Sequence, residues 1–181
     1  MTWMKQDEAL REIRNAESWN RPARLEGALL DGLDLSGIDL RGADLNMAKL
    51  RGSNLSGACL AGAWMRLAGM MDADLRNAIL VYAKLGASAL TNANLSGADL
   101  TGADLGETDL FGADLTGANL SLTYLGSTNF YGATLTDVNL TGAKWDESTT
   151  WPDGFSPPAP LSENRRKSSK RKSSKRKSSR R

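Results

Sequence analysis

The sequence predicts an all-β chain wound into a stacked coil, and two observations carry this prediction. A large apolar residue stands at every fifth position from Leu25 to Trp145, twenty-five positions without a change of register. The residue two places earlier is small at most sites, as Ala43 is before Leu45. A period of five fits neither the 3.6-residue period of a helix nor the two-residue period of a strand, whereas strict short repeats are typical of solenoids.

Each five-residue unit is expected to form one side of a square coil. The large and the small residue of a unit would point inward, and the other three would point to solvent. The centre of such a coil is narrow, which explains why one inward position is small. Gly often stands two places after the large residue, as at Gly97 and Gly117, where it supplies the positive φ that a corner requires.

The units have the form A-[DN]-L-x-x, as in Ala43-Asp44-Leu45, Ala98-Asp99-Leu100 and Ala113-Asp114-Leu115, and they resemble the pentapeptide-repeat family. The resemblance covers residues 23–145 and is specific, because few architectures keep a five-residue register for so long. It implies a right-handed quadrilateral β-helix with four units to a turn. At the strand spacing of stacked β-structure, this corresponds to about six coils in a rod ~30 Å long.

Departures from the repeat divide the chain into four predicted parts. These are an N-terminal helical cap (1–21), the pentapeptide-repeat β-helix (22–145), a C-terminal cap with a Pro-rich linker (146–161) and a disordered Lys/Arg/Ser tail (162–181). Apolar residues at helical spacing predict a short amphipathic helix from about Lys5 to Glu17, which ends before Pro22. Because the first coil of a solenoid leaves its core and strand edges open, we interpret this helix as a cap, with partner binding as the alternative.

The two ends of the chain differ strongly in charge. Residues 1–164 carry a net charge of −9, whereas the last seventeen residues consist of five Lys, six Arg and six Ser and carry +11. With no apolar residue to bury, this tail is predicted to be disordered. Clustered positive charge favours a polyanion, with nucleic acid first and an anionic membrane surface second. The candidate polyanion-binding residues are Arg165, Arg166, Lys167, Lys170, Arg171, Lys172, Lys175, Arg176, Lys177, Arg180 and Arg181.

Other interpretations of the tail stay open. In one alternative the tail only aids solubility, and in another it folds back onto the acidic rod. Its serine pairs follow basic residues and therefore resemble basophilic kinase targets, and phosphorylation would cancel part of the positive charge.

Side chains suited to catalysis are scarce. The sequence has no His and one Cys, Cys59, so a cysteine-rich or imidazole metal site is not expected. No Gly-rich phosphate loop with Lys is present, and carboxylates on a regular solenoid lack the enclosed pocket that shifts pKa values. We therefore predict a protein that is not an enzyme and has no cofactor, no metal and no small-molecule substrate. The lone Cys and the lack of a long apolar run indicate the cytoplasm.

Outward apolar residues suggest a candidate partner surface. The third coil carries Trp64 and Met71 on its outside, and Phe111 and Tyr131 stand in the same column as Met71 when residues twenty apart are stacked. Exposed apolar patches favour contacts with other proteins, whereas neutral drift in a tolerant repeat is the alternative.

Two functions follow from these features. The first is a non-catalytic interaction or scaffold protein, an acidic rod whose polycationic tail tethers it to a polyanion. The second comes from the resemblance, since some pentapeptide-repeat proteins mimic duplex DNA and inhibit or protect type II topoisomerases, which gives quinolone resistance. The alternation of Asp and Asn along one column and the cationic tail argue against mimicry. The protein partner and the oligomeric state stay open, because an aromatic C-terminal end would either close one rod or pair two.

Overall fold

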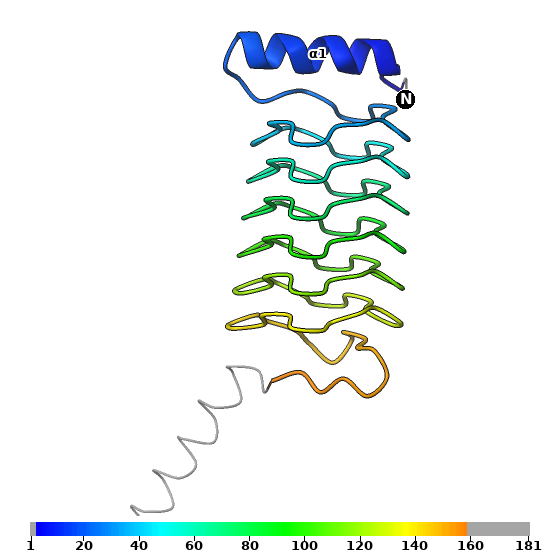
Figure 1. Ribbon diagram of the computed structural model, residues 1–181, viewed down its shortest axis with the longest axis vertical. Coiled ribbons are helices and arrows are strands. Elements are labelled where there is room, and N and C mark those ends of the chain that lie inside the picture. Colours follow the sequence, from blue (N-terminus) through cyan, green and yellow to red (C-terminus); the bar gives the residue numbers. More distant parts are fainter. Residues whose placement is uncertain (1–2, 159–181) are drawn as a thin grey trace, which may run out of the picture.

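A computed structural model describes residues 3–158, which form a β-solenoid (Figure 1). Coils stack along one axis, and the helix α1 (Gln6–Ser18) lies across the N-terminal end. Parallel β-bridges join residues twenty apart, from Arg24 and Asp44 to Tyr124 and Lys144. Each turn of the coil therefore contains four of the five-residue units. The last bridge joins Asn129 to Thr150, one residue further on, because the repeat register ends at Trp145.

One side of a coil bonds to both neighbouring coils. The N–H of Asp44 donates to the carbonyl of Ala23 at 2.9 Å, and the N–H of Leu45 donates to the carbonyl of Trp64 at 2.7 Å. The N–H of Ala48 then donates to the carbonyl of Leu45 at 3.1 Å and closes the turn. Turns take up the rest of each unit. The bridges in residues 3–158 therefore remain isolated and do not extend into strands, and the β-structure is a ladder of single bridges.

Both inward positions are buried, as the repeat predicts. The large residues from Leu25 to Leu140 and most of the small residues are at most 8% exposed. Three larger residues in the small position, Leu33, Ile38 and Val138, stay partly exposed. Hydroxyl groups in this position bond to backbone carbonyls, as the hydroxyl of Thr128 does to Leu105 at 2.7 Å. The buried hydroxyl of Ser88 has no such partner among the described residues.

Every corner from Gly27 to Gly142 has a positive φ, whichever residue occupies it. The predicted role of Gly at corners is confirmed, but it covers only part of the coil. Between Gly62 and Gly97, six successive corners carry side chains at φ values of 55–59°: Leu67, Asp72, Asn77, Tyr82, Ala87 and Asn92. These corners are strained, because side chains disfavour the left-handed region.

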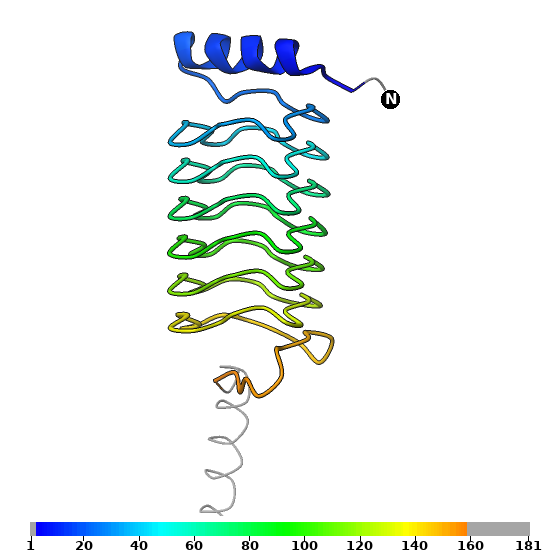
Figure 2. The ribbon, with the colours of Figure 1, turned by 45° about the vertical axis from the view of Figure 1, so that its right-hand side comes forward.

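The helix α1 begins and ends one residue later than the sequence predicts. At its start, the N–H of Lys5 donates to Oε2 of Glu8 at 3.2 Å. Its buried residues, Ala9, Ile13 and Ala16, belong to the same apolar cluster as the coil. The chain leaves the helix at Trp19 and Asn20, which has a φ of 48°, before Pro22. The helix thus places an apolar face on the first layer of the core (Figure 2).

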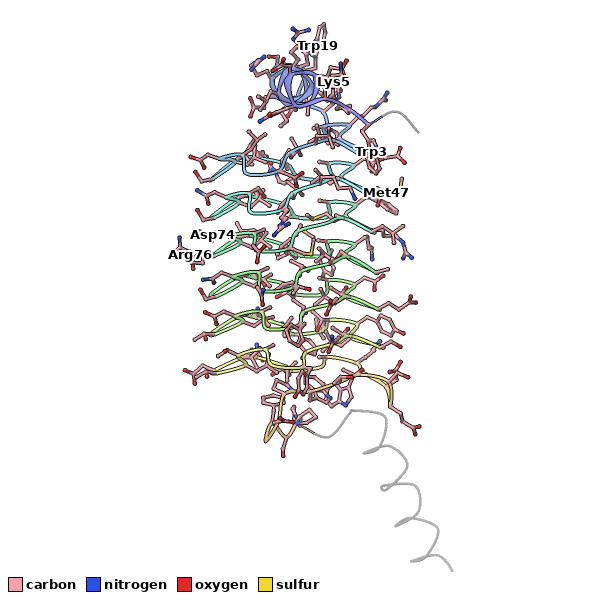
Figure 3. The ribbon with its side chains drawn as sticks, turned by 90° about the vertical axis from the view of Figure 1, so that its right-hand side faces the viewer. Trp3, Lys5, Trp19, Met47, Asp74 and Arg76 are labelled. Carbon is pink, nitrogen blue, oxygen red and sulfur yellow. The ribbon has the colours of Figure 1, made fainter. Side chains whose placement is uncertain are left out.

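An ion pair also ties α1 to the coil. Both carboxylate oxygens of Glu12 accept hydrogen bonds from the Arg21 guanidinium, at 2.6 and 2.9 Å. Oε1 also accepts the backbone N–H of Arg24 at 2.8 Å. The hydrogen bond from Arg21 is the main cause that lowers the pKa of Glu12 to about 2. On the other flank, the ammonium of Lys49 lies 5.0 Å from the ring centre of Trp3, which stands beside Met47 (Figure 3).

At the C-terminal end, aromatic rings cover part of the last layer. Trp151 stacks on Phe130 with ring centres 5.0 Å apart, and Phe155 and Trp145 pack against Trp151 at 5.4 and 5.6 Å. The N–H of Phe155 donates to the carbonyl of Pro152 at 3.1 Å, which forms the turn that carries Phe155 back.

Within residues 3–158, the aromatic rings leave part of this end without a cover. A groove of about 440 Å³ runs beside Leu135, Val138 and Leu140 and is bordered by Phe155 and Pro158. The backbone N–H groups of Leu135 and Leu140 have no hydrogen-bond partner within residues 3–158. The equivalent groups one coil earlier, on Leu115 and Leu120, donate to the next coil at 2.9 and 2.8 Å. Two sides of the last coil therefore keep an open edge in the described part of the chain.

Candidate interaction surfaces

The predicted partner surface divides into two places. Phe111 and Tyr131 stack on each other with ring centres 6.0 Å apart, and both are exposed. Met71 stands in the same column, but Thr91 occupies the coil between Met71 and Phe111. Trp64 belongs to the preceding side of the coil, where it bridges to Asp44 and Lys84. The four residues that the sequence singled out therefore do not form one patch.

Two further exposed apolar side chains stand near Trp64. Leu67 occupies the following corner in the same coil, and Tyr82 occupies the preceding corner one coil further on, whereas Tyr124 and Leu122 lie three coils away, beyond Lys84 and Asp104. We call Trp64, Leu67 and Tyr82 the Trp64 surface. Trp64 also borders a groove of about 720 Å³ that reaches Met4, at the foot of α1. The Trp64 surface is thus separate from the stacked pair of Phe111 and Tyr131.

Glycines in the neighbouring coils make room for these tall side chains. The ring of Tyr82 lies against Gly102 in the next coil, and the ring of Tyr124 lies against Gly106 in the preceding coil, where an added Cβ would stand 2.8 Å from a ring carbon. Leu122 lies against Gly142 in the same way, also at 2.8 Å. The sequence analysis missed the pattern at Tyr82 and Leu122, in which a large outward residue is followed by Gly twenty residues later. The pairing was available as a signal, because twenty is the length of one turn.

The charge of the rod is divided along its axis. Residues 3–84 contain eleven acidic and eleven basic residues, whereas residues 85–158 contain nine acidic residues and one basic residue, Lys144. The four ion pairs of the described chain all lie in the first part, joining Arg21 to Glu12, Arg41 to Asp39, Arg51 to Asp72 and Arg76 to Asp74. Figure 3 shows Asp74 and Arg76 side by side on the outside of the coil. We call residues 85–158 the acidic half of the rod.

Arginine partners lower carboxylate pKa values in the first part of the rod. The guanidinium of Arg41 lowers the pKa of Asp39 through a side-chain hydrogen bond, and Arg76 lowers the pKa of Asp74 in the same way. The pKa of Asp34 is lowered by hydrogen bonds from Ser36. The negative charges of Asp39 and Asp74 are therefore largely neutralised by neighbouring Arg side chains.

Four aspartates surround one coil in the acidic half. Asp99, Asp104, Asp109 and Asp114 occupy the same position in four successive units, one on each side, and we call them the aspartate belt. Oδ1 of each accepts the backbone N–H two residues later, at 2.9–3.2 Å. Among residues 3–158 no Lys or Arg side chain forms an ion pair with any of the four. The fold thus holds four half-buried carboxylates, without an ion-pair partner in the described residues, at one level of the rod.

Residues 3–158 offer no group of three His, Cys, Asp or Glu side chains suited to a metal ion. The thiol of Cys59 is free and half-buried. In the same residues, α1 is too short and too polar to span a membrane. The eleven basic residues predicted to bind a polyanion, Arg165 to Arg181, lie outside the described residues.

Comparison with known proteins agrees with this geometry. The family model described as pentapeptide repeats matches residues 23–57, 34–68, 70–106 and 108–144. These matches cover most of the coil and more than half of the chain. The chain belongs to the pentapeptide-repeat family. No curated protein matched the sequence significantly.

Several solved structures of pentapeptide-repeat proteins are similar to this chain. QnrB1, a plasmid-mediated fluoroquinolone resistance protein, is 21% identical over 71% of this chain and 68% of its own, with a TM-score of 0.50. Rfr23 from the cyanobacterium Cyanothece 51142 is 25% identical over 78% and 98% of the two chains, with a TM-score of 0.47. HetL from the cyanobacterium Nostoc sp. strain PCC 7120, involved in the regulation of heterocyst differentiation, is 34% identical over 68% and 70%, with a TM-score of 0.35. The likeness to QnrB1 shows the shared β-solenoid fold.

Proposed function

We propose that this pentapeptide-repeat protein is a non-catalytic interaction or scaffold protein of the cytoplasm. Its body is a rigid right-handed quadrilateral coil of about six turns, closed at the N-terminal end by α1. Its basic tail tethers this rod to a polyanion, for which nucleic acid is our choice. The rod itself presents the Trp64 surface to a protein partner.

The composition of the tail is the observation that carries the tether. Residues 165–181 hold eleven of the 23 basic residues of the chain and no acidic residue. A protein that neutralises phosphates with Lys and Arg releases condensed counterions, which gives sequence-independent binding that weakens steeply with salt. A run composed only of Lys, Arg and Ser offers many such contacts and little basis for reading a base sequence.

The rod supports binding rather than chemistry. The outward carboxylates are exposed or half-buried in regular columns, and the grooves that the structure describes lie at the two ends of the coil. A general acid or base needs a pKa shifted by an enclosed environment. The Trp64 surface offers Trp and Tyr side chains instead, which are enriched where proteins contact each other.

The tether is tested by titrating labelled duplex DNA with two full-length proteins at low and moderate salt. One is the native chain, and the other has Gln at all eleven basic positions of the tail. We expect the native chain to bind, with an affinity that falls by an order of magnitude or more as salt rises, and the neutral-tail chain to bind at least about tenfold more weakly. A chain with Gln at the six tail serines should bind like the native one. Equal binding by the native and neutral-tail chains would refute the tether.

Inhibition of a type II topoisomerase is the second candidate, favoured by the unpaired carboxylates of the acidic half. The columns of the aspartate belt continue as Asn119, Tyr124, Asn129 and Thr134, so the negative charge is interrupted in the next coil. A DNA-supercoiling assay decides between the candidates. Inhibition by the neutral-tail chain would favour mimicry by the rod, because that variant keeps the rod and lacks the tail charge.

A further inference from the structure

We infer that the acidic half of the rod is the docking surface for the basic tail of the same chain. In this arrangement residues 165–181 lie against the level of the aspartate belt and are released when a polyanion competes for them. The regulatory consequence rests on the tether proposed above, whereas the intramolecular contact does not.

The two halves of the rod differ as docking surfaces for a cationic segment. In residues 3–84 the acidic and basic residues are equal in number, and Asp39, Asp72 and Asp74 already have Arg partners. The acidic half contains nine acidic residues and one Lys, and Lys84 at its border stands next to Asp104 in the same column. Like charges at this density repel one another, so a cation bound to the acidic half relieves this repulsion. On the first half the same cation would relieve little repulsion, because the charges there are already balanced.

The aspartate belt is suited to a cationic ligand that has no fixed conformation. Backbone N–H groups donate to all four Oδ1 atoms, and Thr hydroxyls also donate to Asp99, Asp109 and Asp114, so the carboxylates stay in place without a basic partner. Because the four are distributed around the coil, they offer no enclosed site for a single ion. A flexible segment with many charges can pair with one or two of them at a time from either flank.

The tail also follows the C-terminal end of the rod, which is the end nearer to the aspartate belt. The described chain ends at Pro158, which borders the C-terminal groove beside Val138. Asp99 bridges through Asn119 to Asn139, so the belt lies two coil spacings from the last coil, about 10 Å. Six residues separate Pro158 from Arg165, and such a segment spans up to ~20 Å. The first cations of the tail therefore reach the belt without any change in the rod.

Attachment to the same chain makes a weak contact effective. A short flexible linker holds its ligand at an effective concentration in the millimolar range, so even a modest affinity keeps the tail on the rod at low salt. The contact is electrostatic and exposed, so it weakens as the Debye length falls. A polyanion that binds the tail must first displace the tail from the rod. The apparent affinity of the tail for the polyanion is therefore reduced by the fraction of chains in which the tail is free.

The contact is tested without any polyanion, in the full-length chain. A nitroxide spin label is placed on a cysteine introduced as Ser173→Cys, with Cys59→Ser to leave one thiol. We expect broadening of the backbone amide resonances of residues 99–119 at low salt, little broadening of residues 29–54, and loss of the effect at moderate salt. Broadening that is absent, or equal in the two segments, would overturn the contact, whether or not the tail binds DNA.

Charge-neutral variants then test the competition. Asp99, Asp109 and Asp114 are replaced by Asn, which already occupies their columns at Asn119, Asn129 and Asn94 and accepts the same type of backbone N–H bond. The matched control replaces Asp31, Asp34 and Asp44 by Asn, with the same change in net charge. We expect the belt variant to lose the broadening and to bind duplex DNA about threefold tighter than the control. Equal DNA affinity with intact broadening would overturn the role of the belt. If neither variant binds DNA, the tether has failed, and the broadening alone decides the contact.

Discussion

At the residue scale, the fifth-residue pattern fixes the core, and the corner position sets the strain. Every corner adopts positive φ, so the coil imposes this conformation even on Tyr82 and Ala87. A side chain in the left-handed region costs about 1 kcal/mol relative to Gly. The run of six corners without Gly between Gly62 and Gly97 is therefore the most strained part of the coil.

This strain predicts that Ala87→Gly stabilises the protein. Ala87 has a φ of 57°, and Gly would adopt this value without steric cost. We expect a gain of about 0.5–1 kcal/mol in the free energy of unfolding, measured by urea denaturation. Gly117→Ala is the reciprocal control, because φ is 67° there and no other atom lies within 4 Å of the added Cβ. It should lose a similar amount, and a loss of stability in Ala87→Gly would contradict the argument.

Individual residues were predictable where the repeat decides their position. The large residues from Leu25 to Leu140 and most of the small residues two places earlier are buried, because the period of five puts them at the two inward positions of each unit. The contacts of Tyr82 with Gly102 and of Tyr124 with Gly106 were not predicted. They depend on how a side chain leans across a neighbouring coil, which the spacing within one unit does not determine.

At the scale of elements, α1 shows the same division. Its periodicity and Pro22 predict the helix to within one residue. Its attachment depends on Glu12, Arg21 and the backbone of Arg24, which meet only after the chain reverses direction. A pair nine residues apart across such a reversal has no sequence signature, whereas the apolar face of Ala9, Ile13 and Ala16 has one.

Glu12 makes the attachment of α1 dependent on pH. Its folded pKa, about 2, lies below the ordinary value of 4.5. The ionised carboxylate therefore contributes stability in full above pH 4.5, and this contribution is lost as the pH falls toward 2. We expect Glu12→Gln to lower the free energy of unfolding by about 1 kcal/mol at neutral pH, because the ion pair is close to the surface.

Thermal denaturation between pH 2 and 7 measures this effect. The difference between the native chain and Glu12→Gln should narrow as the pH falls from 4.5 to 2. Glu17→Gln, on the same helix but without an Arg partner among the described residues, serves as the control and should show a difference of less than about 0.5 kcal/mol. A constant difference between native and Glu12→Gln across this pH range would show that Glu12 acts through packing and not through its charge.

At the scale of the whole molecule, the distribution of charged residues along the sequence is more informative than their total charge. Summing over residues 1–164 gives −9 and hides the division between a balanced first half and an acidic second half. The columns followed from adding twenty, which placed Phe111 under Tyr131. The same step places Trp64 in another column, with Asp44 and Lys84, and so separates it from the face of Phe111 and Tyr131.

The two ends of the rod differ in how their last hydrogen bonds are made, and this predicts a gradient of local stability. In repeat proteins each coil is stabilised by its neighbours, so an end without a neighbour opens most easily. The first layer is covered by α1, and the N–H of Leu29 donates to the carbonyl of Met4 at 2.9 Å. At the other end, Leu135 and Leu140 border the open groove.

Hydrogen exchange at single amides measures this gradient. We expect the amides of Leu135 and Leu140 to exchange at least about a hundredfold faster than those of Leu115 and Leu120, which donate to the next coil. The four residues are all Leu in the same two columns, so they form a matched set. Equal protection would mean that the groove is closed in solution, by a second copy of the chain or by the residues that follow Pro158. A concentration series separates these two cases, because only pairing of two chains depends on protein concentration.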